Sequence, residues 1–113
     1  MTHERAAQIF VTINDCTKDD DVLLGLKREL WLLALRYARL RADWRMVARD
    51  ERVAMDAARR RAHDALIDQC NILSLAAGRA GRDNHWRAAL GEDRKEIGDF
   101  ACHVHCILGV EAR

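Results

Sequence analysis

Residues 56–74 carry the side chains of this chain that are best suited to chemistry. A rotation of 100° per residue places seven of them on one strip of a helix: Asp56, Arg60, His63, Asp64, Ile67, Asn71 and Ser74. Metal-dependent phosphohydrolases use such an adjacent histidine and aspartate, together with an earlier histidine and a later aspartate. His3 and Asp99 fit these two further places poorly. We therefore expect the strip to be a partly polar seam, with Arg60 and Asp64 paired one turn apart.

Two further enzyme classes use residue types found here. Small helical ribonuclease toxins pair an arginine with a histidine four to six residues apart on a helix. Arg59 and His63 have three residues between them, and Arg79 and His85 have five but fall in an expected loop. Nucleophilic catalysis by Cys70 with His63 would have to bridge two helical turns, about 10 Å of rise. An enzyme, either a ribonuclease-like toxin or a metal-dependent hydrolase using His63 and Asp64, is thus the alternative interpretation.

The last part of the chain has the residue types of a zinc site without its usual spacing. Cys102 and Cys106 lie one turn apart and can share a metal, which His105 could complete. A CxxC pair is missing, so we expect neither a metal nor another cofactor. The small residues Gly98, Cys102 and Gly109 instead favour close packing of another helix, including one from a second subunit.

Residues 36–61 form an arginine cluster in an otherwise neutral chain. Nine arginines stand against four acidic residues there, a local charge of +5, whereas the whole chain has a net charge of +1. Such a cluster can bind phosphates. We expect its arginines to pair with Asp50, Glu51 and Asp56 instead, so nucleic acid is not the favoured partner, because no aromatic residues interleave with them in the nucleic-acid-binding manner.

Composition favours helices. The chain has 113 residues, 50% of them hydrophobic, with six glycines and no proline. This predicts one all-α domain over residues 1–113 and argues against a disordered chain, a sandwich or a barrel. No segment has the ~20 consecutive apolar residues of a membrane span, and the first residues do not form a signal peptide. We expect a cytoplasmic protein without membrane association, whose four cysteines are free thiols: Cys16, Cys70, Cys102 and Cys106.

Hydrophobic periodicity predicts a four-helix, bundle-like domain. The longest helix has a heptad seam of more than three repeats, made by Leu23, Leu26, Leu30, Leu33, Tyr37, Leu40, Trp44 and Val47. A strand is an alternative for residues 9–13. The expected helices cover residues 3–16, 21–47, 50–77 and 92–109, and a loop with room for one short turn covers 78–91.

The apolar faces of the last two helices define the rest of the expected core. The third helix is expected to bury Met55, Ala58, Ala62, Ala65, Leu66, Ile72, Leu73 and Ala76. The fourth is expected to bury Ile97, Phe100, Ala101, Val104 and Leu108.

The connection between the second and third helices has two interpretations. The heptad register fails at Glu51, so we expect a tight break within residues 42–51, with Asp43 or Asp50 as the next N-cap. The alternative is one helix of nearly sixty residues, which would require an intertwined dimer.

Parts of the second half resemble a known family. The sequences at residues 60–68, 86–87, 90–91 and 93–101, together with Asn71, resemble a small bacterial family of helical proteins without an assigned function. The resemblance implies a helical bundle and selects the polar residues that could form a small pocket: His63, Asp64, Asn71, Trp86, Arg94 and Asp99.

Taken together, these patterns predict a helical binding or interaction module that self-associates as a homo-oligomer, most simply a dimer. The second and fourth helices carry more apolar surface than one four-helix core can bury, which favours this interpretation over an enzyme.

Overall fold

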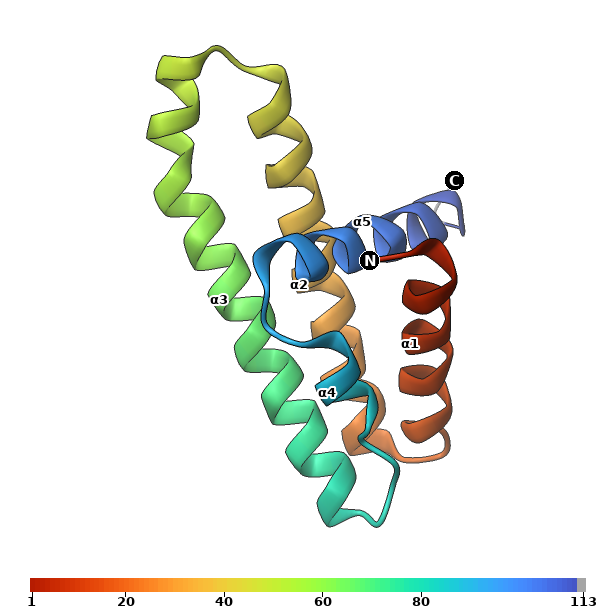
Figure 1. Cartoon of the computed structure of the whole chain (residues 1–113). Coiled ribbons are helices and arrows are strands. Elements are labelled where there is room, and N and C mark those ends of the chain that lie inside the picture. Colours follow the sequence, from red (N-terminus) through yellow and green to blue (C-terminus); the bar gives the residue numbers. More distant parts are fainter. Residues whose placement is uncertain (112–113) are drawn as a thin grey trace.

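Five helices make up the described part of the computed structural model, residues 1–111 (Figure 1). They are α1 (His3–Cys16), α2 (Asp21–Met46), α3 (Arg49–Arg79), α4 (Trp86–Leu90) and α5 (Arg94–Glu111). The all-α, bundle-like prediction is confirmed, and residues 9–13 are helical rather than a strand. None of the helices within residues 1–111 is long and apolar enough to cross a membrane.

The first two helices begin at side-chain caps that the sequence makes available. The Thr2 hydroxyl accepts a hydrogen bond from the backbone N–H of Arg5, and the Asp20 carboxylate accepts one from the N–H of Leu23, at 3.0 Å. These bonds satisfy N–H groups that have no partner within the first helical turn. The expected break before α2 is therefore confirmed, with Asp20 as its N-cap.

The predicted break between α2 and α3 is also confirmed, but its predicted caps are wrong. Val47 and Ala48 both adopt extended backbone, which turns the chain through a tight connection. Ala48 occupies the N-cap position of α3 and makes no side-chain cap. Asp43 lies inside α2, and Asp50 lies in the first turn of α3, where its negative charge favours the positive end of the helix dipole.

The stretch predicted as a loop at 78–91 contains the one-turn helix α4. Gly81 and Gly91, with φ of 73° and 70°, turn the chain at the end of α3 and of α4 in a conformation that side chains other than glycine rarely adopt. The Asn84 amide donates to the backbone carbonyl of Ser74 at 3.0 Å and holds the loop against α3. Helix α5 consequently begins at Arg94 rather than at residue 92.

The core lies where α2 packs against α3 on one side and α5 on another, with α1 and α4 completing it. The expected core residues of α5 are fully buried except Leu108, which is partly buried. The core prediction for α3 holds only in part. Ile72 is 50% exposed, because the neighbouring helices cover the side of α3 that bears Cys70, Leu73 and Ala77. Four further expected core residues are only half-buried: Met55, Ala58, Ala65 and Ala76.

One end of the α2–α3 hairpin extends past the rest of the molecule. Figure 1 shows the end of α2 and the start of α3 projecting beyond α5, in a molecule measuring 47 × 27 × 24 Å. The last buried residue of α2 is Ala38 and the first of α3 is Ala62. We call residues 39–61 the arm. It is a two-helix projection without a buried residue.

Candidate functional site

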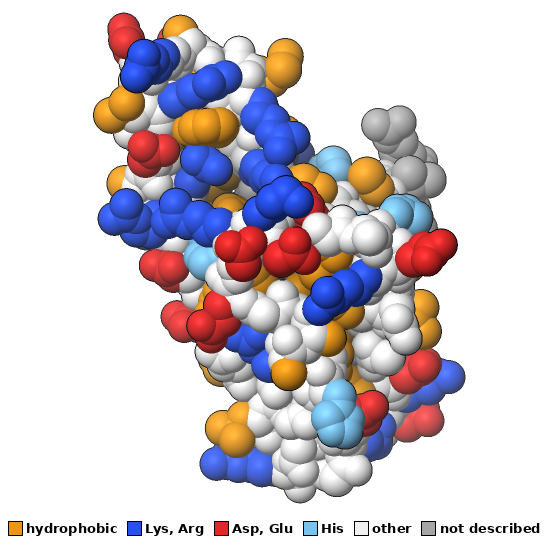
Figure 2. Space-filling view, in the orientation of Figure 1, with side chains coloured by type: hydrophobic (Ala, Val, Ile, Leu, Met, Phe, Trp, Pro, Cys, Tyr) orange, Lys and Arg blue, Asp and Glu red, His pale blue; other side chains and the backbone are white. Residues whose placement is uncertain are grey.

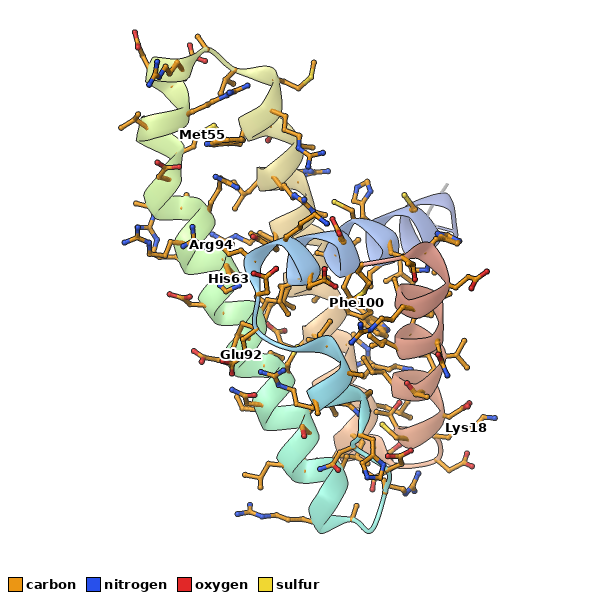
Figure 3. All side chains as sticks on the ribbon, in the orientation of Figure 1. Lys18, Met55, His63, Glu92, Arg94 and Phe100 are labelled. Carbon is orange, nitrogen blue, oxygen red and sulfur yellow. The ribbon has the colours of Figure 1, made fainter. Side chains whose placement is uncertain are left out.

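The six residues of the expected polar pocket do not converge on one site. Asp64 and Asn71 are exposed on α3, and Trp86 is buried in α4. In the view of Figure 3, Arg94 projects near His63, but no hydrogen bond or ion pair joins them within residues 1–111. The six residues are instead spread over separate parts of the structure.

His63 is a packing residue between α2 and α3. Its ring is 9% exposed and meets the ring of Tyr37 edge-on, with centroids 5.7 Å apart. Its Nδ1 lies 3.3 Å from an oxygen of Asp64, and its Nε2 is buried without a hydrogen-bond partner. The predicted Arg60–Asp64 ion pair does not form within the described chain; Asp64 contacts His63 instead.

The other residues on which the enzyme interpretations rested lie apart. Cys70 is fully buried, and burial raises the pKa of its thiol to about 12, which keeps it protonated and unreactive. Arg59 stacks on Trp44, and the His85 side chain is 96% exposed beside Asp83. No catalytic pair is therefore assembled at His63.

Asn71 serves to fasten α4 to α3. The Arg87 guanidinium donates from Nε to the Asn71 side-chain oxygen at 2.7 Å, from Nη1 to the carbonyl of Gly91 at 2.8 Å and from Nη2 to Glu92 at 3.2 Å. This set of bonds joins the middle of α3 to both ends of the short helix. Asn71 thus has a structural role.

Asp99 belongs to a charge network between α5, α2 and the amino group of Met1. It accepts hydrogen bonds from that amino group at 2.7 Å and from Arg41 Nη1 at 3.2 Å. The Met1 ammonium, assisted by Arg41, holds the pKa of the Asp99 carboxyl below its ordinary value despite partial burial. Asp99 therefore joins elements of the fold and does not face His63.

The three candidate zinc ligands divide between two hollows. Cys102 and Cys106 line one hollow beside His3 and His103, whereas His105 lines another with Arg36 and Arg39. Across residues 1–111, no group of three or more His, Cys, Asp or Glu side chains is arranged to hold a metal ion.

Two of the three small residues of α5, Gly98 and Cys102, are covered by the chain itself, whereas Gly109 lines a hollow with His105. A Cβ atom at Gly98 would lie 2.5 Å from Arg41 Nη1, which also approaches Cys102 Sγ at 3.8 Å. The predicted interface across Gly98 and Cys102 is therefore occupied by an arginine of α2. Small residues one turn apart in the sequence indicate that another group packs closely against the helix, but they do not indicate which group it is.

Three arginines of the arm, Arg41, Arg52 and Arg59, interact with other residues of the chain. Arg52 and Arg59 of α3 both stack on the Trp44 ring of α2, with guanidinium carbons 4.7 and 4.2 Å from the ring centroid. Arg52 also donates to the carbonyls of Trp44 and Arg45, the last turn of α2. With Arg41 bound to Asp99, these three are each partly buried.

The remaining five arginines of the arm are exposed: Arg39, Arg45, Arg49, Arg60 and Arg61. The expected pairing with acidic neighbours is largely wrong. Of the three expected acidic partners, Asp56 pairs with Arg59 at 3.6 Å, and neither Asp50 nor Glu51 forms an ion pair within residues 1–111. Figure 2 shows Lys and Arg side chains gathered over the arm on the face in view.

A second feature lies at the opposite end of the α2–α3 hairpin. Val22, Ile72 and Leu75 are 70%, 50% and 57% exposed and line one hollow. We call these three residues the base patch. Asp20 and Arg79 line the same hollow, and neither forms an ion pair within the described residues. Sequence periodicity missed this patch because it placed Ile72 in the core.

Comparison of the chain with protein-family models, curated proteins and solved structures finds no match. The resemblance to a small bacterial helical family therefore stays a prediction. The candidate sites of this protein rest on their own geometry, and two remain: the arginine-rich arm and the apolar base patch.

Proposed function

We propose that this chain is a binding protein that self-associates through the base patch. The observation that carries the proposal is the exposure of three large aliphatic side chains, Val22, Ile72 and Leu75, around one hollow. Large aliphatic side chains exposed together are typical of a surface that another molecule covers.

The proposed occupant is a second copy of the chain. The hollow carries one acidic and one basic residue, Asp20 and Arg79, so the surface is complementary to itself when related by a two-fold axis. An arm-to-arm dimer is disfavoured, because it would bring together two surfaces that each carry exposed arginines without ion-pair partners.

The dimer is expected to be weak. Full burial of an aliphatic side chain contributes ~1.5–3 kcal/mol, and the base patch supplies three partly exposed ones per chain. Association costs at least ~4 kcal/mol in lost freedom of motion. These magnitudes favour a dissociation constant in the micromolar range rather than the nanomolar range.

Sedimentation velocity over a wide concentration range tests the proposal. The wild type should pass from a 12.9 kDa monomer to a species of twice that mass as its concentration rises through the micromolar range. Leu75→Glu should remain monomeric, because dimerisation would bury two carboxylates in an apolar contact.

The matched control is Leu32→Glu. Leu32 is also a leucine with 57% exposure, but it lies ten residues along α2 from Val22. This variant should dimerise as the wild type does. A monomeric wild type at all concentrations, or equal loss of dimer in both variants, would contradict the proposal.

A further inference from the structure

The arm contributes charge to the molecule without contributing core. No residue from 39 to 61 is buried. Near the start of the arm Arg41 bonds to Asp99 of α5, and past that contact the two arm helices pack chiefly on each other at one end of the molecule (Figure 1). Eight arginines stand against four acidic residues over this range. Keeping so many like charges on a thin projection opposes folding through mutual repulsion, so stability of the fold does not explain the arm.

The arm is ordered by a few of its own arginines. Arg52 and Arg59 stack on Trp44, and Arg52 also donates hydrogen bonds to the carbonyls of Trp44 and Arg45 in the last turn of α2. Each cation–π contact contributes ~0.5–1 kcal/mol at a partly exposed site. The remaining arginines are thereby displayed on two fixed helices rather than on a loop, which lowers the ordering cost of binding.

We propose that the arm binds the phosphodiester backbone of nucleic acid through its exposed arginines. Arg45, Arg49 and Arg60 are the principal contacts: all three are exposed and form no hydrogen bond or ion pair with the rest of the described chain through their side chains. The arginine guanidinium binds phosphate with two parallel hydrogen bonds, which a lysine cannot do.

The spacing of these arginines favours a polymer of phosphates over a single small anion. Arg49 and Arg60 are eleven residues apart on α3, which is about three turns. They therefore lie on one face of the helix, about 16 Å apart along its axis. One phosphate or nucleotide cannot reach both, whereas a nucleic-acid strand presents a phosphate at each nucleotide along its length.

The side chains of the arm favour backbone contact over base reading and over a membrane. Trp44 is flanked by arginines and is not free to stack on an unpaired base, the contact on which single-strand binders depend. The large exposed hydrophobic residues of the arm are Met46 and Val53 near its tip, far less than the broad apolar face of a membrane-surface helix. We therefore expect duplexes to bind at least as tightly as single strands, with little dependence on sequence.

Fluorescence anisotropy with labelled 20-base-pair DNA, 20-base-pair RNA and a 20-nucleotide single strand tests the proposal. At ~50 mM salt the wild type should bind the duplexes, with affinity falling steeply as salt is raised to ~200 mM. The DNA and RNA probes distinguish the two sources of the same backbone chemistry.

The decisive variant is Arg45→Gln/Arg49→Gln/Arg60→Gln. Loss of three phosphate contacts should weaken duplex binding roughly 10- to 100-fold and reduce the log–log salt slope by about two to three. The matched control, Lys18→Gln/Arg28→Gln/Arg94→Gln, removes the same charge from exposed positions outside the arm and should bind nearly as the wild type does. Circular dichroism confirms that both variants retain their helices.

The proposal is independent of the base patch, so its failure is distinguishable from failure of the dimer. Leu75→Glu should keep both the affinity and the salt slope of the wild type, because the base patch lies at the opposite end of the α2–α3 hairpin from the arm. Absence of duplex binding at ~50 mM salt, equal weakening by both triple variants, or preference for anionic lipid vesicles over duplexes would overturn the proposal.

Discussion

The arm and the body are made from the same two helices, and they differ in what covers those helices. In the body, α2 and α3 bury Leu30 and Leu66 completely against each other and the rest of the core. In the arm, the same pair of helices continues with α5 reaching only its start, where Arg41 bonds to Asp99, and the surface is occupied by arginines. The body supplies stability, and the arm displays charge at a distance from it. Substitutions should therefore separate the two regions.

The largest expected effect is a loss of stability in the body that has no equivalent in the arm. Leu66→Ala leaves a cavity at a fully buried position and should lower the free energy of unfolding by ~2–5 kcal/mol. Val53→Ala, at a side chain that is 70% exposed, should change it by less than ~0.5 kcal/mol. Urea unfolding followed by circular dichroism measures both. Similar costs at the two positions would show that the arm is part of the cooperative core.

A smaller, local effect is expected from Trp44→Ala. This substitution removes the ring on which Arg52 and Arg59 stack and should loosen the arm by ~1–2 kcal/mol. Native-state hydrogen exchange should accelerate at residues 42–58 and stay unchanged in α5. Uniform acceleration in both regions would contradict the division between arm and body.

Labelling of the cysteine thiols should distinguish buried from exposed parts of the native protein. Cys106 is exposed and should react with a thiol reagent at once in the native protein. Cys70 is buried with a pKa of about 12 and should react only on unfolding. Cys106 lies outside the base patch, so its labelling should be equally fast for monomer and dimer. Protection of Cys106 at high protein concentration would place the interface on α5 instead.

The weakest expected effect is a pH dependence of folding stability that arises from His103. This residue of α5 lines the same hollow as Arg45 of the arm. Burial, together with the nearby His3, lowers the pKa of His103 below its ordinary 6.5. The unfolded chain then binds this proton more readily than the folded one, so stability should decrease as pH falls from 7 through 6.5 and toward the lower folded pKa. Thermal unfolding at pH 7 and 5 should show a smaller difference for His103→Gln than for the wild type; an equal difference would exclude this origin.

The contrast between arm and body also shows which structural features could be predicted from the sequence. The periodic spacing of Ile97, Phe100 and Val104 correctly predicted their burial, and the loss of register at Glu51 correctly predicted a break before it. These patterns reflect local geometry, since a residue's place on a helix face follows from its number.

What the sequence could not provide is whether another element covers a given face. The heptad seam was predicted to run to Val47, yet its last buried position is Tyr37, because α5 reaches α2 beyond that point only through polar contacts such as Arg41 with Asp99. Asp99 and His63 were grouped from sequence, but their positions depend on how α5 lies across α2. Periodicity indicates which side of a helix faces its neighbour. How deeply a residue on that side is buried depends on the lengths of the neighbouring helices and on where they cross it.

Sedimentation velocity of the protein mixed with a fluorescent 20-base-pair duplex tests the separation of the two sites most directly. We predict that Leu75→Glu sediments with the duplex as a complex without protein dimer, and that the triple arginine variant forms the dimer but leaves the duplex free. Loss of both dimer and duplex binding in either variant would contradict this account, because the base patch and the arm would then be one site.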